Sequence, residues 1–244
     1  MTGRLTVIGI GPGHELDRTM RAELALQDAE VVVGYDKYIK YVESLLGNKI
    51  TIKSGMTKEV ERCRAAFNMA TLGYKVALIS SGDAGIYGMA GLALEMAKVE
   101  SFTVPIEIIP GVSAANAAAA AFGAPLMLDW ACLSLSDLLV DWETITRRLT
   151  AIAAADLVVA LYNPRSYRRI RQLEEASKIL LKYRPNATPV GIGTSLGTAD
   201  QQIVISTLGQ FCSENISMHS LVIVGNTTSR IENNWFITPR GYKL

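Results

Sequence analysis

A glycine-flanked carboxylate is the residue in this sequence best placed to do chemistry. Asp83 lies between Gly82 and Gly85 in the stretch VALISSGDAGIYGMAG, which covers residues 76–91. An apolar run long enough for one buried strand precedes it, and apolar residues at helical spacing follow it. The glycines allow the backbone to approach a ligand closely, and the carboxylate can cap the helix or hold a ligand hydroxyl or amine. A plain strand-to-helix turn fits the same residues, so this stretch alone leaves both interpretations open.

Other segments also combine small, polar and turn-forming residues directly after a predicted strand. They are GIGPGHELD at 9–17, PGVSAA at 110–115, LYNPRS at 161–166 and GIGTSLGTADQ at 191–201. Within them, Tyr162 can stack on a flat ring. Arg165 follows a strand's carboxyl end, where a guanidinium can hold a substrate carboxylate through two hydrogen bonds. Each segment also fits a structural turn or a capped packing helix.

The first of these loops resembles a dinucleotide-binding loop in part. Its glycines follow a strand-like run, and Asp36 follows the second strand, where a ribose-binding acid would lie. That fingerprint requires glycine at the sixth position, which is His14 here, and Pro12 removes one amide that would bind a pyrophosphate. A tight turn, or a loop facing another ligand, is the better interpretation. A nicotinamide-dependent oxidoreductase is kept as an alternative function.

Composition narrows the class of protein. The chain has 244 residues, is 49% hydrophobic and 19% charged, and carries a formal net charge of +1. These values predict full globular cores, and the small charge argues against nucleic-acid binding through a general basic field. Three scattered cysteines and two histidines predict neither disulfides nor a metal site, and they favour a reducing, cytoplasmic location. No apolar run reaches the roughly 18 residues of a membrane span, so no membrane partner is expected.

The order of predicted elements places the chain in the α/β class. Strands alternate with helices through the first half, which predicts a mainly parallel sheet with helices on both faces. The last strong strands follow one another closely, which favours antiparallel pairing and a mixed second sheet. The turn-rich segment FGAP at 122–125 marks the expected boundary between an N-terminal α/β domain, residues 1–123, and a C-terminal α/β domain, residues 124–244.

The apolar patterns give the expected bounds of the elements. The expected strands are residues 5–10, 31–33, 50–53, 76–79, 106–109, 131–135, 157–161, 190–193, 202–207 and 220–225, with an edge strand at 235–238. The expected helices are residues 18–28, 37–46, 58–72, 86–96, 114–121, 142–154 and 167–183.

Taken in order, these segments resemble the tetrapyrrole (corrin and porphyrin) methyltransferase family over nearly the whole chain. The resemblance rests on GIGPG at 9–13, SGDAGIYG at 81–88, PGVSA at 110–114, LYNP at 161–164 and VIVGN at 222–226. Within the family, the chain resembles the ring-contracting branch, which methylates precorrin-3B or cobalt-factor III at ring carbon 17 in cobalamin biosynthesis. The segments GDAGIYGMAG at 82–91, LSLSDLL at 133–139, YNPRS at 162–166 and ITPRGY at 237–242 carry this closer likeness. Ala84 stands where many relatives that act on uroporphyrinogen have proline, which also favours this branch.

The resemblance implies two α/β domains with S-adenosylmethionine bound in the cleft between them, a tetrapyrrole as small-molecule substrate, and a homodimer. It assigns the cofactor contacts to Pro12, Ser81, Gly82, Asp83, Ile86, Ser113, Ala114, Tyr162 and Gly197. It places the first glycine loop on the tetrapyrrole side of the cleft. The acetate and propionate groups of the substrate require a few well-placed cations, for which Lys37, Lys53 and Arg165 are the candidates.

Ring contraction needs a proton to move, so a general acid or base is expected. The candidates are His14, Asp36, Asp83, Asp129 and Asp137. His14 and Asp137 rank first because they lie in loops predicted to face the cleft. Alternative functions are another tetrapyrrole methyltransferase, such as one acting on uroporphyrinogen III, a diphthine-synthase-like enzyme that methylates a protein, and a non-catalytic binding module. The presence of cobalt in the substrate, and completion of ring contraction by this chain alone, stay open at this point.

Overall fold

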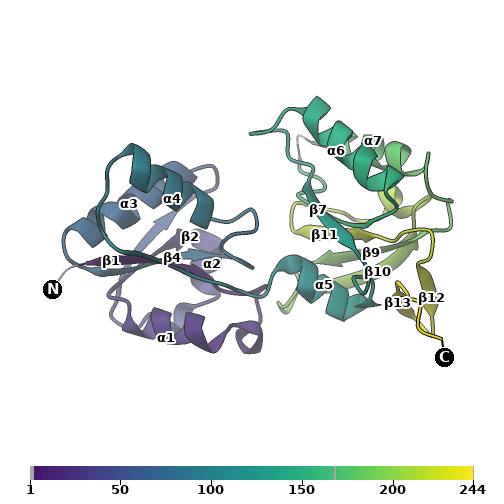
Figure 1. Cartoon of the computed structure of the whole chain (residues 1–244). Helices are drawn as coiled ribbons and strands as arrows, with labels where there is room; N and C mark the ends of the chain where they lie inside the picture. The colour runs from purple at the N-terminus through teal and green to yellow at the C-terminus, as the bar shows by residue number, and fades with distance from the viewer. Residues whose placement is uncertain (1–2, 168, 244) are drawn as a thin grey trace. The chain divides into compact units, whose positions relative to one another are not determined.

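A computed structural model describes residues 3–167 and 169–243. The chain divides into two compact units, Met1–Ala114 and Ala115–Leu244 (Figure 1). The division falls earlier than the boundary expected after residue 123, because helix α5 (Ala114–Phe122) packs with the second unit. Phe122 is fully buried, and a Cβ atom at Gly191 would lie 2.4 Å from its ring. The turn-rich segment after Phe122 forms a short strand of the second unit.

The first unit is built on a five-stranded parallel sheet in the order β3-β2-β4-β1-β5. The strands are β1 (Arg4–Gly9), β2 (Val31–Tyr35), β3 (Ile50–Ser54), β4 (Lys75–Ser80) and β5 (Ile106–Ile109). Most are short apolar runs, as expected of strands covered on both faces. Along β1, Val7 belongs to the core on one face of the sheet and Ile8 to the core on the other.

Helices cover both faces of this sheet (Figure 1). The elements are η1 (Glu15–Asp17), α1 (Met20–Asp28), α2 (Asp36–Lys40), η2 (Glu43–Leu45), α3 (Glu59–Thr71) and α4 (Ala90–Val99). Helices α3 and α4 pack on one side, and α1 and α2 on the other. Helix α4 begins later than the apolar spacing from Ile86 predicts. Tyr87 has a φ of 51°, which no helix accommodates, so residues 83–89 form an extended turn instead.

The second unit contains a mixed sheet in the order β10-β9-β11-β8-β7. Its strands are β7 (Trp130–Ser134), β8 (Val158–Tyr162), β9 (Pro189–Thr194), β10 (Gln202–Thr207) and β11 (Ser220–Val224). Strands β7 and β8 are parallel, and the remaining pairs are antiparallel. Helices α6 (Trp142–Ala154) and α7 (Arg171–Leu180), with η3 (Phe211–Ser213), share one core with this sheet.

A small third sheet corrects the expectation for the C-terminal strand. Strands β6 (Gly123–Ala124), β12 (Arg230–Glu232) and β13 (Trp235–Ile237) pair in the order β12-β13-β6. Strand β13 is therefore the middle strand of a separate sheet, where an edge strand of the second sheet was expected. The α/β class, with a parallel first sheet and a mixed second sheet, is confirmed. Within the described ranges, no helix combines the length and apolar character needed to cross a bilayer.

Candidate functional site

The loops that follow β1, β4 and β5 pack against one another through their backbones. The Gly11 amide donates to the Gly82 carbonyl at 3.1 Å, and the Gly82 amide donates to the Gly11 carbonyl at 2.7 Å. A Cβ atom at Gly111 would lie 2.2 Å from the Gly82 carbonyl oxygen and 2.7 Å from that of Gly9, so no side chain fits there. Because these strands are neighbours in a parallel sheet, their exits form one backbone surface at its carboxyl edge, where α/β proteins bind ligands.

The Asp83 carboxylate connects two of these loops. Its Oδ1 accepts a hydrogen bond from the Gly85 amide at 2.8 Å, and its Oδ2 accepts one from the Gly111 amide at 3.0 Å. One carboxylate thus joins the β4 exit to the β5 exit through two charge-assisted hydrogen bonds. Asp83 therefore positions the turn, and its remaining lone pairs are available to a ligand.

The predicted cofactor contacts of the first unit gather around this turn. Gly82 has a φ of +65°, and a Cβ atom there would lie 3.6 Å from the Ala114 amide nitrogen and 3.8 Å from the Ser113 Cα. Ser81 precedes this glycine directly, and the Ile86 side chain is 37% exposed. Pro12 is half-buried and directly follows the glycine that is bonded to the turn. The structure brings these positions together, and their contact with a cofactor stays a prediction.

The two predicted contacts in the second unit also lie where strands end. The Tyr162 hydroxyl accepts a hydrogen bond from the Ala115 amide at 3.1 Å, which places its side chain at the amino end of α5. Gly197 lies in the loop after β9 with a φ of +71°, and its amide donates to Gln201 Oε1 at 2.8 Å. Both residues therefore lie in ordered turns of the second unit.

Strained backbone marks the same strand exits. Tyr87, Asn163 and Ser195 have φ values of 51°, 49° and 50° and follow β4, β8 and β9 respectively. A left-handed conformation at a tyrosine or a serine costs about 1–3 kcal/mol and persists only where the surroundings impose it, whereas an asparagine adopts it with little strain. These loops are therefore held in defined conformations, which is what a preorganised binding surface requires.

Two segments that carry the closer family likeness lie side by side in the second unit. The Leu135 amide donates to the Tyr162 carbonyl at 2.9 Å, and Asn163 Nδ2 donates to Ser134 Oγ at 3.0 Å. Arg169 Nη1 donates to the carbonyls of Asn163 and Leu135 at 2.9 and 3.3 Å, so it braces both segments. Arg169 is not among the predicted site residues, because nothing in the local sequence marks an arginine that binds backbone carbonyls.

The two leading acid–base candidates are each held by one hydrogen bond. His14 is exposed, and its Nδ1 accepts from the Leu16 amide at 3.1 Å, which caps η1. Asp137 is half-buried, and its Oδ2 accepts from Gln172 Nε2 at 2.9 Å. Within the described structure, His14 Nε2 and Asp137 Oδ1 have no hydrogen-bond partner, and a role for either atom in proton exchange stays a prediction.

The three predicted substrate cations lack carboxylate partners among the described residues. Arg165 Nη2 donates to the Cys212 carbonyl at 3.4 Å, and its buried Nε has no hydrogen-bond acceptor in the described structure. Lys53 is exposed on the edge strand β3, and Lys37 is half-buried in the first turn of α2. Their positive charges are therefore available to an anion.

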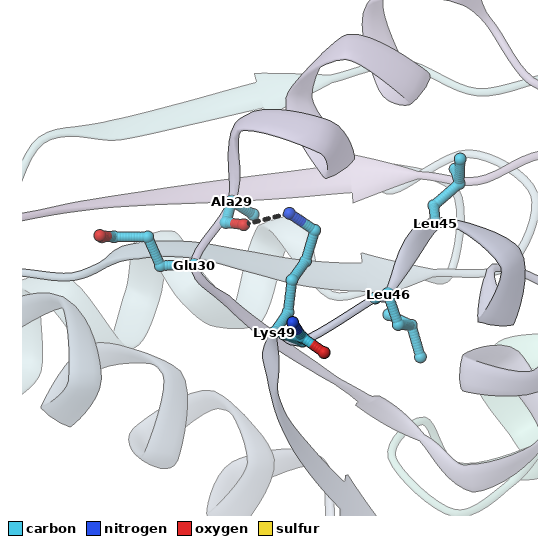
Figure 2. A pocket seen from close by; sticks show the side chains of 7 residues that line it. Ala29, Glu30, Leu45, Leu46 and Lys49 are labelled. Atoms are coloured by element: carbon cyan, nitrogen blue, oxygen red, sulfur yellow. Dashed lines mark hydrogen bonds between the residues drawn. The ribbon is translucent and has the colours of Figure 1, made fainter.

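A pocket of ≈ 450 Å³ lies at the amino ends of β2 and β3 in the first sheet (Figure 2). Residues 29–30 and 45–49 line it, and they precede β2 and β3. The Lys49 ammonium group donates to the carbonyls of Gln27 and Ala29 at 2.8 and 2.7 Å. A cation that binds carbonyls at a helix C-terminus stabilises that helix. The lysine in this pocket therefore has a structural role, which is to cap α1.

Across residues 3–167 and 169–243, no three His, Cys, Asp or Glu side chains gather as a possible metal site. Burial raises the pKa of the Cys63 thiol to about 11, so this thiol stays neutral within the core.

A model of the family described as Tetrapyrrole (Corrin/Porphyrin) Methylases matches residues 4–212. The chain belongs to this family. It is 49% identical over 240 residues to the probable cobalt-factor III C(17)-methyltransferase of Salmonella typhimurium, a match that covers 98% of this methylase and 100% of the relative. It is 37% identical over 250 residues to the precorrin-3B C(17)-methyltransferase of a Sinorhizobium species, covering 99% and 98% of the two chains.

Solved structures share the fold of this methylase. The methyltransferase CobJ superposes with a TM-score of 0.90 and 34% identity, over 97% of this chain and 100% of that one. The uroporphyrin-III C-methyl transferase of Thermus thermophilus, complexed with S-adenyl homocysteine, gives a TM-score of 0.68 at 21% identity, over 91% and 92% of the two chains. Family and fold together identify this chain as a methyltransferase, as the sequence predicts.

The backbone packing at Gly111 leads to a first prediction. Gly111→Ala places a methyl group 2.2 Å from the Gly82 carbonyl oxygen, so the backbone must move. We expect the free energy of unfolding, measured by urea denaturation, to fall by about 1–3 kcal/mol. Gly91→Ala in α4 is the matched control, since no atom lies within 4 Å of its new methyl group. Equal stability of the two variants would contradict the close packing.

Proposed function

We propose that this methylase transfers a methyl group from S-adenosylmethionine to ring carbon 17 of a corrin precursor, cobalt-factor III or precorrin-3B, with ring contraction. The single observation that carries the proposal is the surface formed by the exits of β1, β4 and β5 around Asp83. The relatives that match this chain over nearly their full length are named for this reaction, which agrees with it. A homodimer in the cytoplasm is part of the proposal.

The residues at this surface fit the chemistry of S-adenosylmethionine. The Asp83 carboxylate, with lone pairs to spare, suits an amine or a hydroxyl group of the ligand. The exposed Ile86 side chain offers an apolar surface to an adenine ring, and Gly82 lets the ligand approach the backbone. Ser81, Pro12, Ser113 and Ala114 complete the proposed contacts of the first unit, and Tyr162 and Gly197 are the proposed contacts of the second unit. When bound, the cofactor supplies an already activated methyl group.

The work left to the protein is positioning, water exclusion and one proton transfer. Holding two reactants in line can supply about 7–11 kcal/mol of the barrier, and rigid strand exits serve this purpose. We propose that Lys37, Lys53 and Arg165 bind carboxylates of the substrate, because their charges are unpaired among the described residues. His14 Nε2 and Asp137 are the proposed sites of proton exchange during ring contraction.

The nicotinamide alternative is less compatible with this geometry. A pyrophosphate would need free amides in the first loop, but the Gly11 amide already donates to the Gly82 carbonyl. Pro12 contributes no amide. The Gly11 amide of this loop is therefore already hydrogen-bonded to the Asp83 turn.

Ligand binding and turnover test the proposal directly. We expect calorimetry to show binding of S-adenosylhomocysteine and none of NAD, and we expect Asp83→Asn to weaken that binding about tenfold or more. The Asn amide group cannot accept from both glycine amides at once, so the turn loses one of its two bonds. Incubation with S-adenosylmethionine and, in turn, cobalt-factor III, precorrin-3B and uroporphyrinogen III, followed by absorption spectra and mass, identifies the substrate. A wild-type protein that binds NAD, or methylates only uroporphyrinogen III, would contradict us.

Charge reversal tests the proposed carboxylate contact. Arg165→Glu should raise the substrate KM about tenfold or more while the dissociation constant of S-adenosylhomocysteine stays unchanged, because only the substrate contact is lost. Lys182→Glu is the matched control, since Lys182 is exposed just beyond the end of α7. Equal damage to cofactor and substrate binding would argue against this placement of Arg165.

The role of His14 can be separated from its capping bond. Asparagine is a favoured N-cap residue, so His14→Asn retains an acceptor for the Leu16 amide while removing the imidazole. We expect the yield of ring-contracted product per unit time to fall about 100-fold or more, with unchanged thermal stability. Asp137→Asn, which keeps an oxygen acceptor for Gln172, tests the second candidate in the same assay. Wild-type turnover in either variant removes that residue from the mechanism.

A further inference from the structure

Two arginines are buried in the first unit without a carboxylate to balance them. Arg62, the fourth residue of α3, is 5% exposed, and Arg18, between η1 and α1, is 9% exposed. In the described parts of the chain, neither guanidinium forms an ion pair. A buried charge is costly unless it is paired, so these positions need an explanation.

Within the described structure, Arg62 contacts neutral groups. Its Nε donates to Ser54 Oγ and its Nη2 to the Gly55 carbonyl, both at 2.8 Å, while Nη1 lies 3.8 Å from Met89 Sδ. The guanidinium carbon lies 5.9 Å from the centre of the Tyr35 ring. The first turn of a helix gives no stabilisation to a cation, because the macrodipole favours anions there. Arg62 therefore has neutral partners and one aromatic ring beside it, but no anion.

Arg18 is even less satisfied. Its Nη2 donates to the Tyr41 carbonyl at 2.8 Å, and its buried Nε has no acceptor among the described residues. A guanidinium offers five N–H donors in a planar fork that matches a carboxylate. This side chain therefore has both the charge and the free donors to hold an anion.

A third buried arginine of the same chain has a carboxylate beside it, although its Nε, like that of Arg18, has no hydrogen-bond acceptor in the described structure. Arg184 has a fully buried side chain that donates to the carbonyls of Gly225 and Leu157, and its Nε lies 3.8 Å from Asp156 Oδ1. Burial lowers the pKa of Arg184, and Asp156 opposes that effect. Here the fold supplies a carboxylate, whereas it supplies none for Arg62 or Arg18.

Both unpaired arginines adjoin the surface around Asp83. Arg62 contacts Met89, which ends the turn after Asp83. Arg18 lies in the loop after β1, and Gly11 of the same loop is hydrogen-bonded to the Asp83 turn. A Cβ atom at Gly11 would lie 3.6 Å from the Arg18 amide nitrogen. Arg62 therefore contacts the turn after Asp83 through its side chain, whereas Arg18 lies in the neighbouring loop through its backbone and directs its guanidinium to the Tyr41 carbonyl.

Three tyrosines connect the arginines. The rings of Tyr35 and Tyr38 meet edge to face at 5.1 Å, and those of Tyr38 and Tyr41 stack at 6.3 Å. Burial raises the pKa of the Tyr38 hydroxyl, so it stays a neutral phenol. Aromatic rings between two cations suit a flat, polycarboxylate ligand, because rings stack on its face while guanidiniums bind its edge.

We propose that Arg18 and Arg62 are recognition residues for two carboxylate side chains of the tetrapyrrole substrate, with Tyr35, Tyr38 and Tyr41 forming the aromatic surface between them. This inference rests on the proposed function and names the part of the first unit that selects the substrate by charge. Neither arginine is among the cofactor contacts proposed above.

Binding of a stable corrinoid tests this assignment. The probe is cobyrinic acid, a polycarboxylate corrinoid, and its fully methyl-esterified form is the uncharged counterpart. Arg62→Gln and Arg18→Gln should each weaken binding of the acid about tenfold or more, and leave binding of the ester and of S-adenosylhomocysteine unchanged. Arg62→Lys, which restores the charge, should recover most of the lost affinity.

The chain offers a matched control for each variant. Arg64→Gln removes an exposed arginine of α3 that pairs with Glu100, and Arg21→Gln removes one of α1 that pairs with Glu107. Both should bind the acid like wild type. If Arg62→Gln does not fold, Arg18→Gln, which lies outside α3, decides the question. Wild-type affinity for the acid in a folded Arg62→Gln or Arg18→Gln variant overturns the inference, whereas a wild type that binds no S-adenosylhomocysteine refutes the proposed function instead.

Discussion

Backbone contact between three loops is the constraint on which the first unit depends. The exits of β1, β4 and β5 approach so closely that the Gly82 carbonyl oxygen occupies the space that a side chain would need at Gly9 and at Gly111. Such proximity would leave polar backbone groups unsatisfied, but the Asp83 carboxylate and the paired amides of Gly11 and Gly82 bind them. At the carboxyl edge of the sheet, the loops after β1, β4 and β5 therefore form a surface that consists mainly of backbone atoms.

Much of the fold follows from local patterns, and its departures follow from distant contacts. Apolar runs such as Val31–Val33 predict their strands well, because a parallel strand is buried on both faces. The start of α4 at Ala90 does not follow from spacing, since a left-handed Tyr87 intervenes. The assignment of α5 to the second unit depends on Phe122 packing at Gly191, which no local pattern reveals.

The candidate site divides in the same way. Glycine spacing around Asp83 correctly predicts a strand exit, but the spacing does not reveal that both carboxylate oxygens accept hydrogen bonds from backbone amides. Arg62 escapes sequence reading because charged neighbours in EVERCR suggest a solvated helix face. A usable signal exists, since Arg62 precedes Ala66 and Ala70 at intervals of four and so shares their buried face. Arg18 has no such signal, as a loop has no periodicity.

The mutual hydrogen bonds of Gly11 and Gly82 have a mechanical consequence. Displacement of the loop after β1 must either break both bonds or carry the turn of Asp83 along with it. The two loops consequently share one conformational equilibrium, and a molecule that shifts either loop changes the free energy of occupying the other. Linkage of this kind acts equally in both directions, so the order in which two molecules arrive does not alter their combined affinity.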